Sequence, residues 1–250
     1  MSVQSRSFPI SFMVTTEVPC PYLPDRMERK IITELAGSQA NDMFELLSRA
    51  GFRRSHSIAY RPACAACQAC VPVRIDVAGF VTSRSMRRVL ARNADLSSEI
   101  RPAHPTQEQY QLFSRYLEAR HNDGEMVGMG PQDYASMVAD SPIDSRMIEF
   151  RDPSRKLVAA CLTDWSGDGI SAVYSFFTPE PVSASLGTFV VLRLLELARQ
   201  AGLPYLYLGY WVKGSQKMDY KRRFQPLERY GADGWRRMTE DEIAGETGEE

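Results

Sequence analysis

The sequence lacks long apolar segments and has few histidines. No run approaches the roughly 18 apolar residues that span a bilayer, and the first residues hold no basic stretch followed by an apolar core. The three histidines, His56, His104 and His121, show neither metal-site nor triad spacing. We therefore expect a cytoplasmic protein with no membrane partner.

Signatures of nucleotide and serine hydrolases are also missing. The sequence contains no P-loop, no G-x-G-x-x-G and no nucleophile elbow. A nucleotide hydrolase or a serine hydrolase is therefore not expected. The five cysteines of a cytosolic chain are expected to be ligands, reactive thiols or core residues rather than disulfides.

What is present is an ordinary globular composition with an uneven charge distribution. With 250 residues, 44% hydrophobic and 24% charged, the chain can form one large domain or two small ones. The segment 239–250 carries six acids and no base, so that 30 basic residues face 25 acidic ones over the rest. This acidic tail is predicted to be disordered.

Positive charge gathers in three segments. Residues 49–74 hold five arginines and no acid, residues 84–92 carry arginines at helical spacing, and residues 213–230 hold six bases against two acids. Such clusters attract a polyanion such as RNA, although solvated basic faces are also common.

The hydrophobic periodicity predicts an α+β fold with a mixed sheet. Helices are expected over 41–50, 83–95, 106–121, 131–138 and 187–200, and strands over 55–60, 71–77, 147–150, 156–163, 170–177 and 205–208. Three strands, a helix and a final strand indicate a helix crossover. A boundary at His104-Pro105 would separate a cysteine-containing domain, 1–104, from a second domain, 105–238, followed by the tail 239–250.

The stretch Pro204 to Lys221 combines a strand with a basic, aromatic loop. The strand is predicted to break at Gly209, after which Tyr210 and Trp211 precede lysines at 213, 217 and 221. Glycine in a strand often marks a bulge or a close backbone approach, and aromatic and basic side chains supply stacking faces and anion partners. An ordinary strand followed by a solvated loop is the alternative.

Three cysteines form a C-x-x-C-x-x-C motif. Cys64, Cys67 and Cys70, joined by Cys20, could hold zinc or an iron–sulfur cluster, because a tight turn can direct successive thiolates at one centre. Redox-sensitive free thiols and simple packing are the alternatives. Cys161 lies in an apolar strand and is expected in the core.

A helix start and an opened strand together indicate an acyl-binding cleft. The helix that begins near Ser185-Leu186-Gly187-Thr188 offers backbone N–H groups to an anion and follows the strand that contains Tyr174 and Ser175. With the opening after Leu208, this arrangement resembles the acyl-donor cleft of GNAT-like acyltransferases. Acetyl-CoA users carry two glycines in this loop, whereas here only Gly187 is present, which disfavours coenzyme A.

The assembled motifs carry a more specific resemblance over residues 10–236. They are CPYLP (20–24), MERK (27–30), GFRRS (51–55), AYRPAC (59–64), ARNAD (91–95), YSF (174–176), SLGTF (185–189), YLGYW (207–211) and KMDYK (217–221). In these the chain resembles the bacterial aminoacyl-tRNA–protein transferases of the arginyltransferase superfamily, most closely the aspartate/glutamate leucyltransferases.

The resemblance implies a GNAT-like fold behind the smaller cysteine-containing domain, and a reaction. Such enzymes move an amino acid from its tRNA ester to the α-amine of a protein that begins with Asp or Glu, and so mark that protein for degradation. The implied partners are aminoacyl-tRNA, leucyl-tRNA first, and the acidic acceptor protein. No cofactor is required for transfer. Eukaryotic relatives imply a cluster at the cysteines but not its metal. Arginyl transfer, CoA-dependent N-acetylation and a non-enzymatic metal-ribbon module remain alternatives.

The chemistry requires positioning more than a strong base. The ester is already activated, and an α-amine with a pKa of about 7.7–8.0 is partly free at neutral pH. Arg29, Lys30, Lys217 or Lys221 could hold the acceptor's carboxylate. The alternative for each is a solvated surface base.

Further roles follow for the donor and the transition state. Tyr210 and Trp211 could stack on the tRNA end, with the arginines of 49–74 and 84–92 on phosphates. The backbone at Leu208 and Gly209, or the Tyr220 hydroxyl, could meet the oxyanion. The predicted catalytic residues are Tyr210, Asp219, Tyr220 and Lys221; the predicted substrate-binding residues are Arg29, Lys30, Tyr174, Ser175, Gly187, Thr188, Leu208, Gly209, Trp211 and Lys217.

Overall fold

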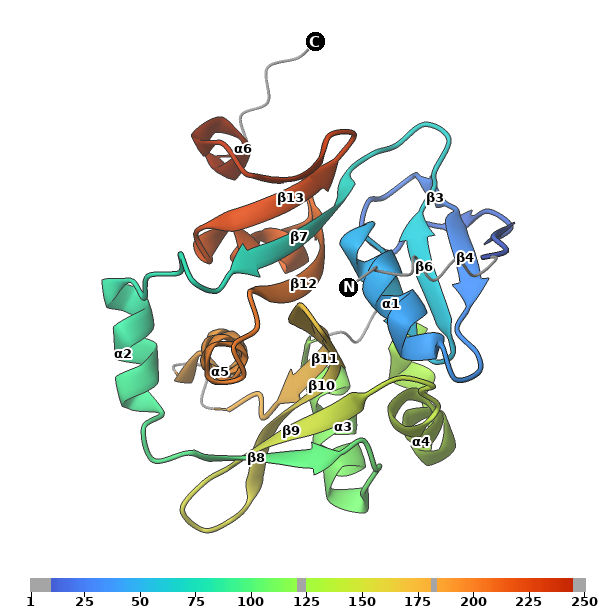
Figure 1. Ribbon diagram of the computed structural model, residues 1–250. Coiled ribbons are helices and arrows are strands. Elements are labelled where there is room, and N and C mark those ends of the chain that lie inside the picture. Colours follow the sequence, from blue (N-terminus) through green and yellow to red (C-terminus); the bar gives the residue numbers. More distant parts are fainter. Residues whose placement is uncertain (1–9, 121–124, 181–183, 245–250) are drawn as a thin grey trace, which may run out of the picture.

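The computed structural model describes residues 10–120, 125–180 and 184–244, and its centre is an eight-stranded mixed sheet (Figure 1). The strand order is β14-β13-β7-β12-β11-β10-β9-β8. The strands are β7 (Cys70–Asp76), β8 (Ser97–Pro102), β9 (Ser145–Arg151), β10 (Leu157–Ser166), β11 (Gly169–Phe177), β12 (Tyr205–Val212), β13 (Leu227–Gly231) and β14 (Gly234–Arg237). The α+β class with a mixed sheet is thereby confirmed.

The predicted order of three strands, a helix and a strand is also confirmed. β9, β10 and β11 pair antiparallel, the turn at 166–169 joins the last two, and α5 (Leu186–Gln200) crosses to β12, which runs parallel to β11. α5 is almost wholly apolar along 189–197, and it is buried because the sheet and a second helix both cover it.

Helices cover both faces of the sheet. α5 and α2 (Arg84–Arg92) contribute to one core cluster, whereas α3 (Gln107–Arg120) and α4 (Pro131–Ala139) contribute to a second (Figure 1). Two short 3-10 helices are η1 (Glu125–Gly128) and η3 (Gln216–Arg223). None of the helices over the described residues is long and apolar enough to cross a membrane.

A smaller unit built from the N-terminal residues lies beside the end of β12. Its four-stranded sheet has the order β1-β4-β6-β5 and is covered by α1 (Ala40–Arg49). The strands are β1 (Met13–Val14), β4 (Lys30–Glu34), β5 (Arg53–Ser55) and β6 (Ile58–Pro62), and a separate ribbon pairs β2 (Val18–Pro19) with β3 (Met27–Glu28).

Three predicted boundaries require correction. The boundary at residue 104 does not bound the large sheet, because β7 and β8 precede it and still pair within that sheet. Part of the tail predicted to be disordered forms the short helix α6 (Glu240–Ala244), and its last residues, 245–250, lie outside the described residues. The strand predicted to break at Gly209 continues to Val212, because β7 supports it from the other side.

Candidate functional site

The candidate site begins where β11 and β12 separate. Their parallel pairing covers only 169–171 and 205–207, and it ends at Ser171 and Tyr207. Beyond that point β12 stays paired with β7, with a register shift between Tyr207 and Gly209. Gly209 has φ +74°, a left-handed conformation that favours glycine. The predicted opening of the strand is therefore present on the β11 side only.

The guanidinium of Arg53 fills this opening. Its Nη2 donates to the carbonyl oxygens of Ala172 at 3.0 Å and Val173 at 2.9 Å on β11. On the β12 side, a Cβ atom built on Gly209 would lie 2.2 Å from Arg53 Nη1. Arg53 therefore satisfies carbonyls that a neighbouring strand would otherwise pair, and Gly209 leaves room for it.

β5 holds Arg53 in this opening because the next residue, Arg54, anchors the strand to the large sheet. Arg54 donates to both carboxylate oxygens of Asp164 on β10, at 2.8 Å each, and the two side chains are 1% and 0% exposed. Ser145 also donates to Asp164. A bidentate buried pair of this kind fixes orientation as well as position.

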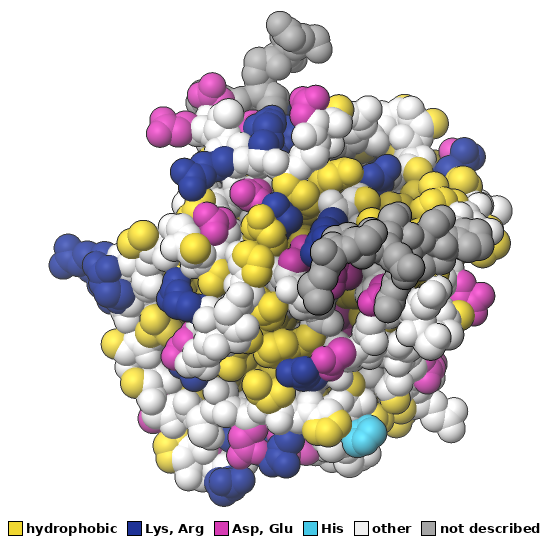
Figure 2. Space-filling view, viewed as in Figure 1, with side chains coloured by type: hydrophobic (Ala, Val, Ile, Leu, Met, Phe, Trp, Pro, Cys, Tyr) yellow, Lys and Arg dark blue, Asp and Glu magenta, His cyan; other side chains and the backbone are white. Residues whose placement is uncertain are grey.

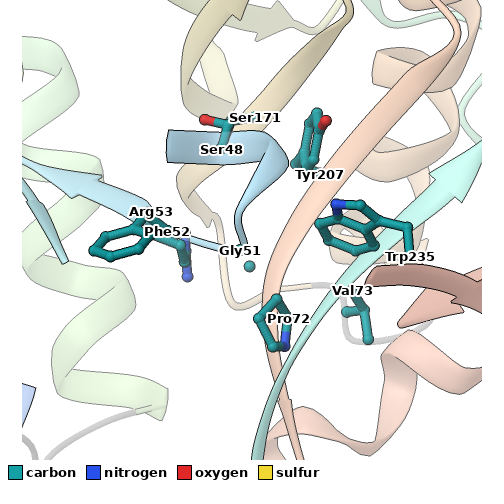
Figure 3. Close-up of a pocket in the computed structure, with 10 residues that line it drawn as sticks. Ser48, Gly51, Phe52, Arg53, Pro72, Val73, Ser171, Tyr207 and Trp235 are labelled. Atoms are coloured by element: carbon teal, nitrogen blue, oxygen red, sulfur yellow. The ribbon is translucent and has the colours of Figure 1, made fainter. Parts of the chain in front are cut away.

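A small cavity lies beside Arg53 (Figure 3). Its volume is about 10 Å³, which is room for about one water molecule. Figure 3 shows Arg53 and Phe52 on one side of the cavity, with Tyr207 and Trp235 on the other. The hydroxyl of Ser48, a further lining residue, is buried without a hydrogen-bond partner among the described residues. The cavity suits a structural water rather than a substrate.

Tyr210 lies at the contact between the two units and holds them together. Its hydroxyl lies 3.2 Å from the carbonyl oxygen of Gly51 and 3.0 Å from that of Tyr60, so it donates into the small unit. Its side chain is only 2% exposed, and its ring lies 6.1 Å from that of Tyr60. Tyr210 is therefore not an open stacking face for a nucleotide, and that predicted role is wrong.

Lys221 is the buried lysine of η3. It is 3% exposed, and its Nζ donates to the carbonyl oxygen of Tyr210. Burial lowers the pKa of Lys221 well below its ordinary value, the charge of Arg53 lowers it further, and Cys70 opposes the change. Burial and the neighbouring guanidinium therefore both disfavour the charged form of this amine.

Further aromatic hydroxyls surround Arg53. Tyr22, from the CPYLP turn, has its pKa raised to about 12 by burial and by Tyr60, with Arg53 opposing. Tyr220 also feels the charge of Arg53 and is 37% exposed, which places it at the rim. Residues from four distant motifs therefore meet around one guanidinium.

This cluster can handle both a proton and a developing negative charge. The pKa of Lys221 is lowered by burial and by Arg53, which favours a role as proton acceptor. The part-buried guanidinium of Arg53 and the partly exposed phenol of Tyr220 supply positive charge and a hydrogen-bond donor. The arrangement suits acyl transfer to an amine.

Several predicted residues lie outside the cluster in ion pairs. Asp219 pairs with Arg222 at 2.5 Å and is half exposed, Arg29 pairs with Glu17 at 3.3 Å, and Lys30 pairs with Glu28 at 2.7 Å. The Nζ atom of Lys30 also lies over the ring of Tyr60, 5.7 Å from its centre. Lys217 is exposed on η3.

The second predicted device, the start of α5, forms a separate cavity. Gly187 and Thr188 line a cavity of about 260 Å³ with Arg120 and Phe177. Tyr174 packs in the core with its ring 5.8 Å from that of Phe113. Two other predicted residues lie on the strands. Ser175 on β11 is partly buried, and Leu208 on β12 is buried.

The cysteines converge without forming a ready metal site. Burial raises the pKa of Cys70 to about 12, and Cys20, Cys64 and Cys67 add to this effect, so the four thiols lie within electrostatic range. Among the described residues, however, no group of three or more His, Cys, Asp and Glu side chains is placed to hold a metal ion. A metal at these thiols stays a prediction. Cys161 is fully buried.

Three arginines of 49–74 bind carboxylates of distant elements. Arg54 and Arg74 are buried in pairs with Asp164 and Glu228, and Arg49 bonds Asp168. The predicted role on phosphates is therefore wrong for Arg54 and Arg74, which tie elements of the fold together, and it stays a prediction for Arg49, whose side chain is 53% exposed. The sequence analysis did not predict Tyr22, Arg53 and Tyr60 as catalytic or substrate-binding residues. Each lies in one of the motifs CPYLP, GFRRS and AYRPAC, and this was the signal that could have identified them.

The chain matches known proteins along most of its length. Residues 18–88 match the family model described as arginine-tRNA-protein transferase, N terminus, and residues 108–231 match the C terminus of the same description. The chain is 56% identical over 230 residues to a protein of Paramagnetospirillum magneticum named aspartate/glutamate leucyltransferase, covering 92% of this chain and 94% of that one.

Further similarities include a second curated protein and a solved structure. A protein of the same name from Nitrobacter hamburgensis is 52% identical over 246 residues, covering 95% of each chain. The crystal structure of FemX aligns with a TM-score of 0.45 and 8% identity over 76% of this chain and 65% of that one.

Proposed function

We propose that this chain, which belongs to the arginine-tRNA-protein transferase family, transfers leucine from leucyl-tRNA to the α-amine of proteins that begin with aspartate or glutamate. The names of its relatives support this choice of donor and acceptor. The observation that carries the proposal is the convergence of distant motif residues, Gly209 and Lys221 among them, on Arg53 in the opening of the sheet.

The reaction exchanges an ester for an amide. The acceptor's α-amine attacks the ester carbonyl carbon of leucyl-tRNA, a C–N bond forms, and the bond between that carbon and the ribose oxygen breaks. The amine loses one proton, which Lys221 accepts as a neutral base and returns to the departing ribose oxygen. Because an ester is already activated, no cofactor is needed.

Arg53 contributes positive charge where the ester oxygen becomes negative. Its guanidinium is held by Ala172 and Val173 before any substrate binds, so little reorganisation is needed when charge develops. The partly exposed Tyr220 hydroxyl supports the same oxygen from the rim.

The position of Arg53 also argues against coenzyme A as donor. An extended acyl-carrier arm that paired with the opened edge of β11 would need the carbonyl groups of Ala172 and Val173. Both already accept from Arg53. A CoA-dependent N-acetyltransferase would have to displace a guanidinium that already makes two hydrogen bonds to these carbonyls, which is costly.

Helix α2 is the surface that best suits tRNA phosphates. Arg84, Arg87, Arg88 and Arg92 are all exposed on this helix of nine residues. In Figure 2 dark blue side chains project over it at the left. Exposed arginines on one helix supply the salt-dependent, sequence-independent part of nucleic-acid binding.

The product would begin with leucine, which we propose marks it for degradation in the cytoplasm. The test is incubation of the protein with Asp-, Glu- and Asn-starting peptides and a mixed pool of charged tRNAs, followed by mass spectrometry. We expect one leucine on the acidic peptides and none on the Asn peptide. Addition of arginine would overturn the proposed donor, and no addition from any tRNA would overturn the reaction.

A further inference from the structure

The largest cavity described lies on the other side of β12 from Tyr210. Its volume is about 610 Å³, within the range of small-ligand pockets, which is roughly 300–1,000 Å³. Trp211 lines it, whereas the preceding Tyr210 points its hydroxyl into the small unit. Further walls come from the turn at 23–26, the loop at 68–69, the middle of β13 and α6.

The lining of this cavity combines an apolar floor with a cationic rim. Leu23, Val71, Trp211 and Met238 are apolar, and the cations are Arg26, Lys213 and Arg229, with Glu242 the one acid. Two lining residues, Trp211 and Arg229, also carry buried N–H groups, at Nε1 and Nε, without a partner among the described residues. The chemistry suits a ligand that brings a carboxylate attached to a short apolar stem.

One carboxylate of the chain already occupies the rim. Glu242 of α6 accepts from Arg229 Nη1 and from both terminal nitrogens of Arg236, and from the backbone N–H of Thr239. The Arg236 hydrogen bond, with Thr239 and Arg229, lowers the pKa of Glu242 to about 2. The rim thus binds the carboxylate of a peptide segment within the same molecule.

The cavity is connected to the transfer site through shared backbone. Lys221 donates to the carbonyl of Tyr210, the residue that precedes Trp211 on β12. Arg222, next to Lys221, donates to the carbonyl of Ile243 on α6. A peptide held here would therefore lie beside the element that carries the proposed base.

We propose that this cavity binds the acidic side chain of the acceptor protein's first residue, and that Glu242 occupies the same cationic rim until the acceptor replaces it. The proposal rests on the transfer function proposed above. A peptide is favoured over RNA because the cations line a pocket with an apolar floor and already hold a peptide carboxylate, whereas the exposed cations of α2 form an open strip.

The test separates the two substrates kinetically. Lys213→Met and Arg229→Gln should each raise KM for an Asp-starting peptide by about tenfold, the loss of one charge-assisted contact, and leave KM for leucyl-tRNA unchanged. Glu242→Gln should lower the peptide KM, because the internal competitor is gone. Lys156→Met, an exposed lysine before β10, is the matched control.

Two other outcomes overturn the proposal. An unchanged peptide KM in both Lys213→Met and Arg229→Gln, with wild-type protein still active, would show that the acceptor binds elsewhere. A raised KM for tRNA alone would assign the cavity to RNA. A wild-type protein without any transfer would instead refute the proposed function itself. Circular dichroism of each variant excludes loss of folding as the cause.

Discussion

Gly209 and Arg53 are a matched pair: a Cβ on Gly209 would lie 2.2 Å from Arg53 Nη1. Only a residue without a side chain at position 209 leaves room for the guanidinium of Arg53, from the small unit, to enter the large sheet. The guanidinium of Arg53 thus fills the opening between β11 and β12.

Replacing Gly209 should damage both stability and transfer. Gly209→Ala places a methyl group in a left-handed conformation at φ +74°, which costs about 1–2 kcal/mol, and also displaces Arg53. Gly202→Ala is the control, because it has φ +68° but nothing within 4 Å of its new Cβ. Urea unfolding should show a larger loss for Gly209→Ala, and equal losses would contradict the contact.

Arg53 should set the pH dependence of transfer. Its positive charge lowers the pKa of Lys221, after burial itself, while Cys70 raises it. In Arg53→Gln the pKa of Lys221 therefore rises, and the acid limb of the rate profile moves to higher pH. Arg61→Gln, which lies over Phe52, should leave the limb in place. An unmoved limb in Arg53→Gln would remove Lys221 as the base.

The buried pair of Arg54 and Asp164 should dominate the joining of the two units. Arg54→Met leaves an uncompensated buried carboxylate and should cost about 3–5 kcal/mol of unfolding free energy. Asp144→Asn breaks the exposed pair of Asp144, 44% exposed, with Arg146, 36% exposed, and should cost at most about 1 kcal/mol. Denaturant titration of both variants compares them directly, and similar small losses would refute the anchoring role.

Helix α2 should contribute to the salt dependence of tRNA binding. Arg84→Gln with Arg88→Gln removes two exposed charges and should reduce the slope of log K against log salt by up to about 2. KM for the acceptor peptide should not change. Arg155→Gln with Lys156→Gln, exposed before β10, is the charge-matched control, and an equal effect of the control would show only a loss of net charge.

The sequence predicted the elements of the large sheet well because their signals are local. Period-two patterns, the turn at 166–169 and the apolar helix 187–200 each specify themselves within a short window. The pairing of β7 with β12 and β13 is not local, so the boundary at 104 looked like a domain boundary although the sheet includes β7 and β8.

The sequence predicted where the candidate site lies, but it identified only some of the residues that form it. Lys221 and Gly209 stood out because a basic, aromatic segment followed a strand glycine. Arg53 could not be separated from Arg54, since adjacent arginines give the same local pattern while one fills the sheet opening and the other pairs with Asp164. Tyr210 and Trp211 likewise face opposite sides of β12, and only the strand geometry shows which is which.

The most direct test of the account is single-turnover transfer of leucine to an Asp-starting peptide by Lys221→Met. Removing a buried amine that burial and Arg53 disfavour in its charged form should leave the midpoint of thermal unfolding unchanged or raised. The transfer rate should fall by about 10²–10⁴-fold, the contribution of a positioned acid–base group. A folded Lys221→Met protein that transfers leucine at the wild-type rate would contradict the account.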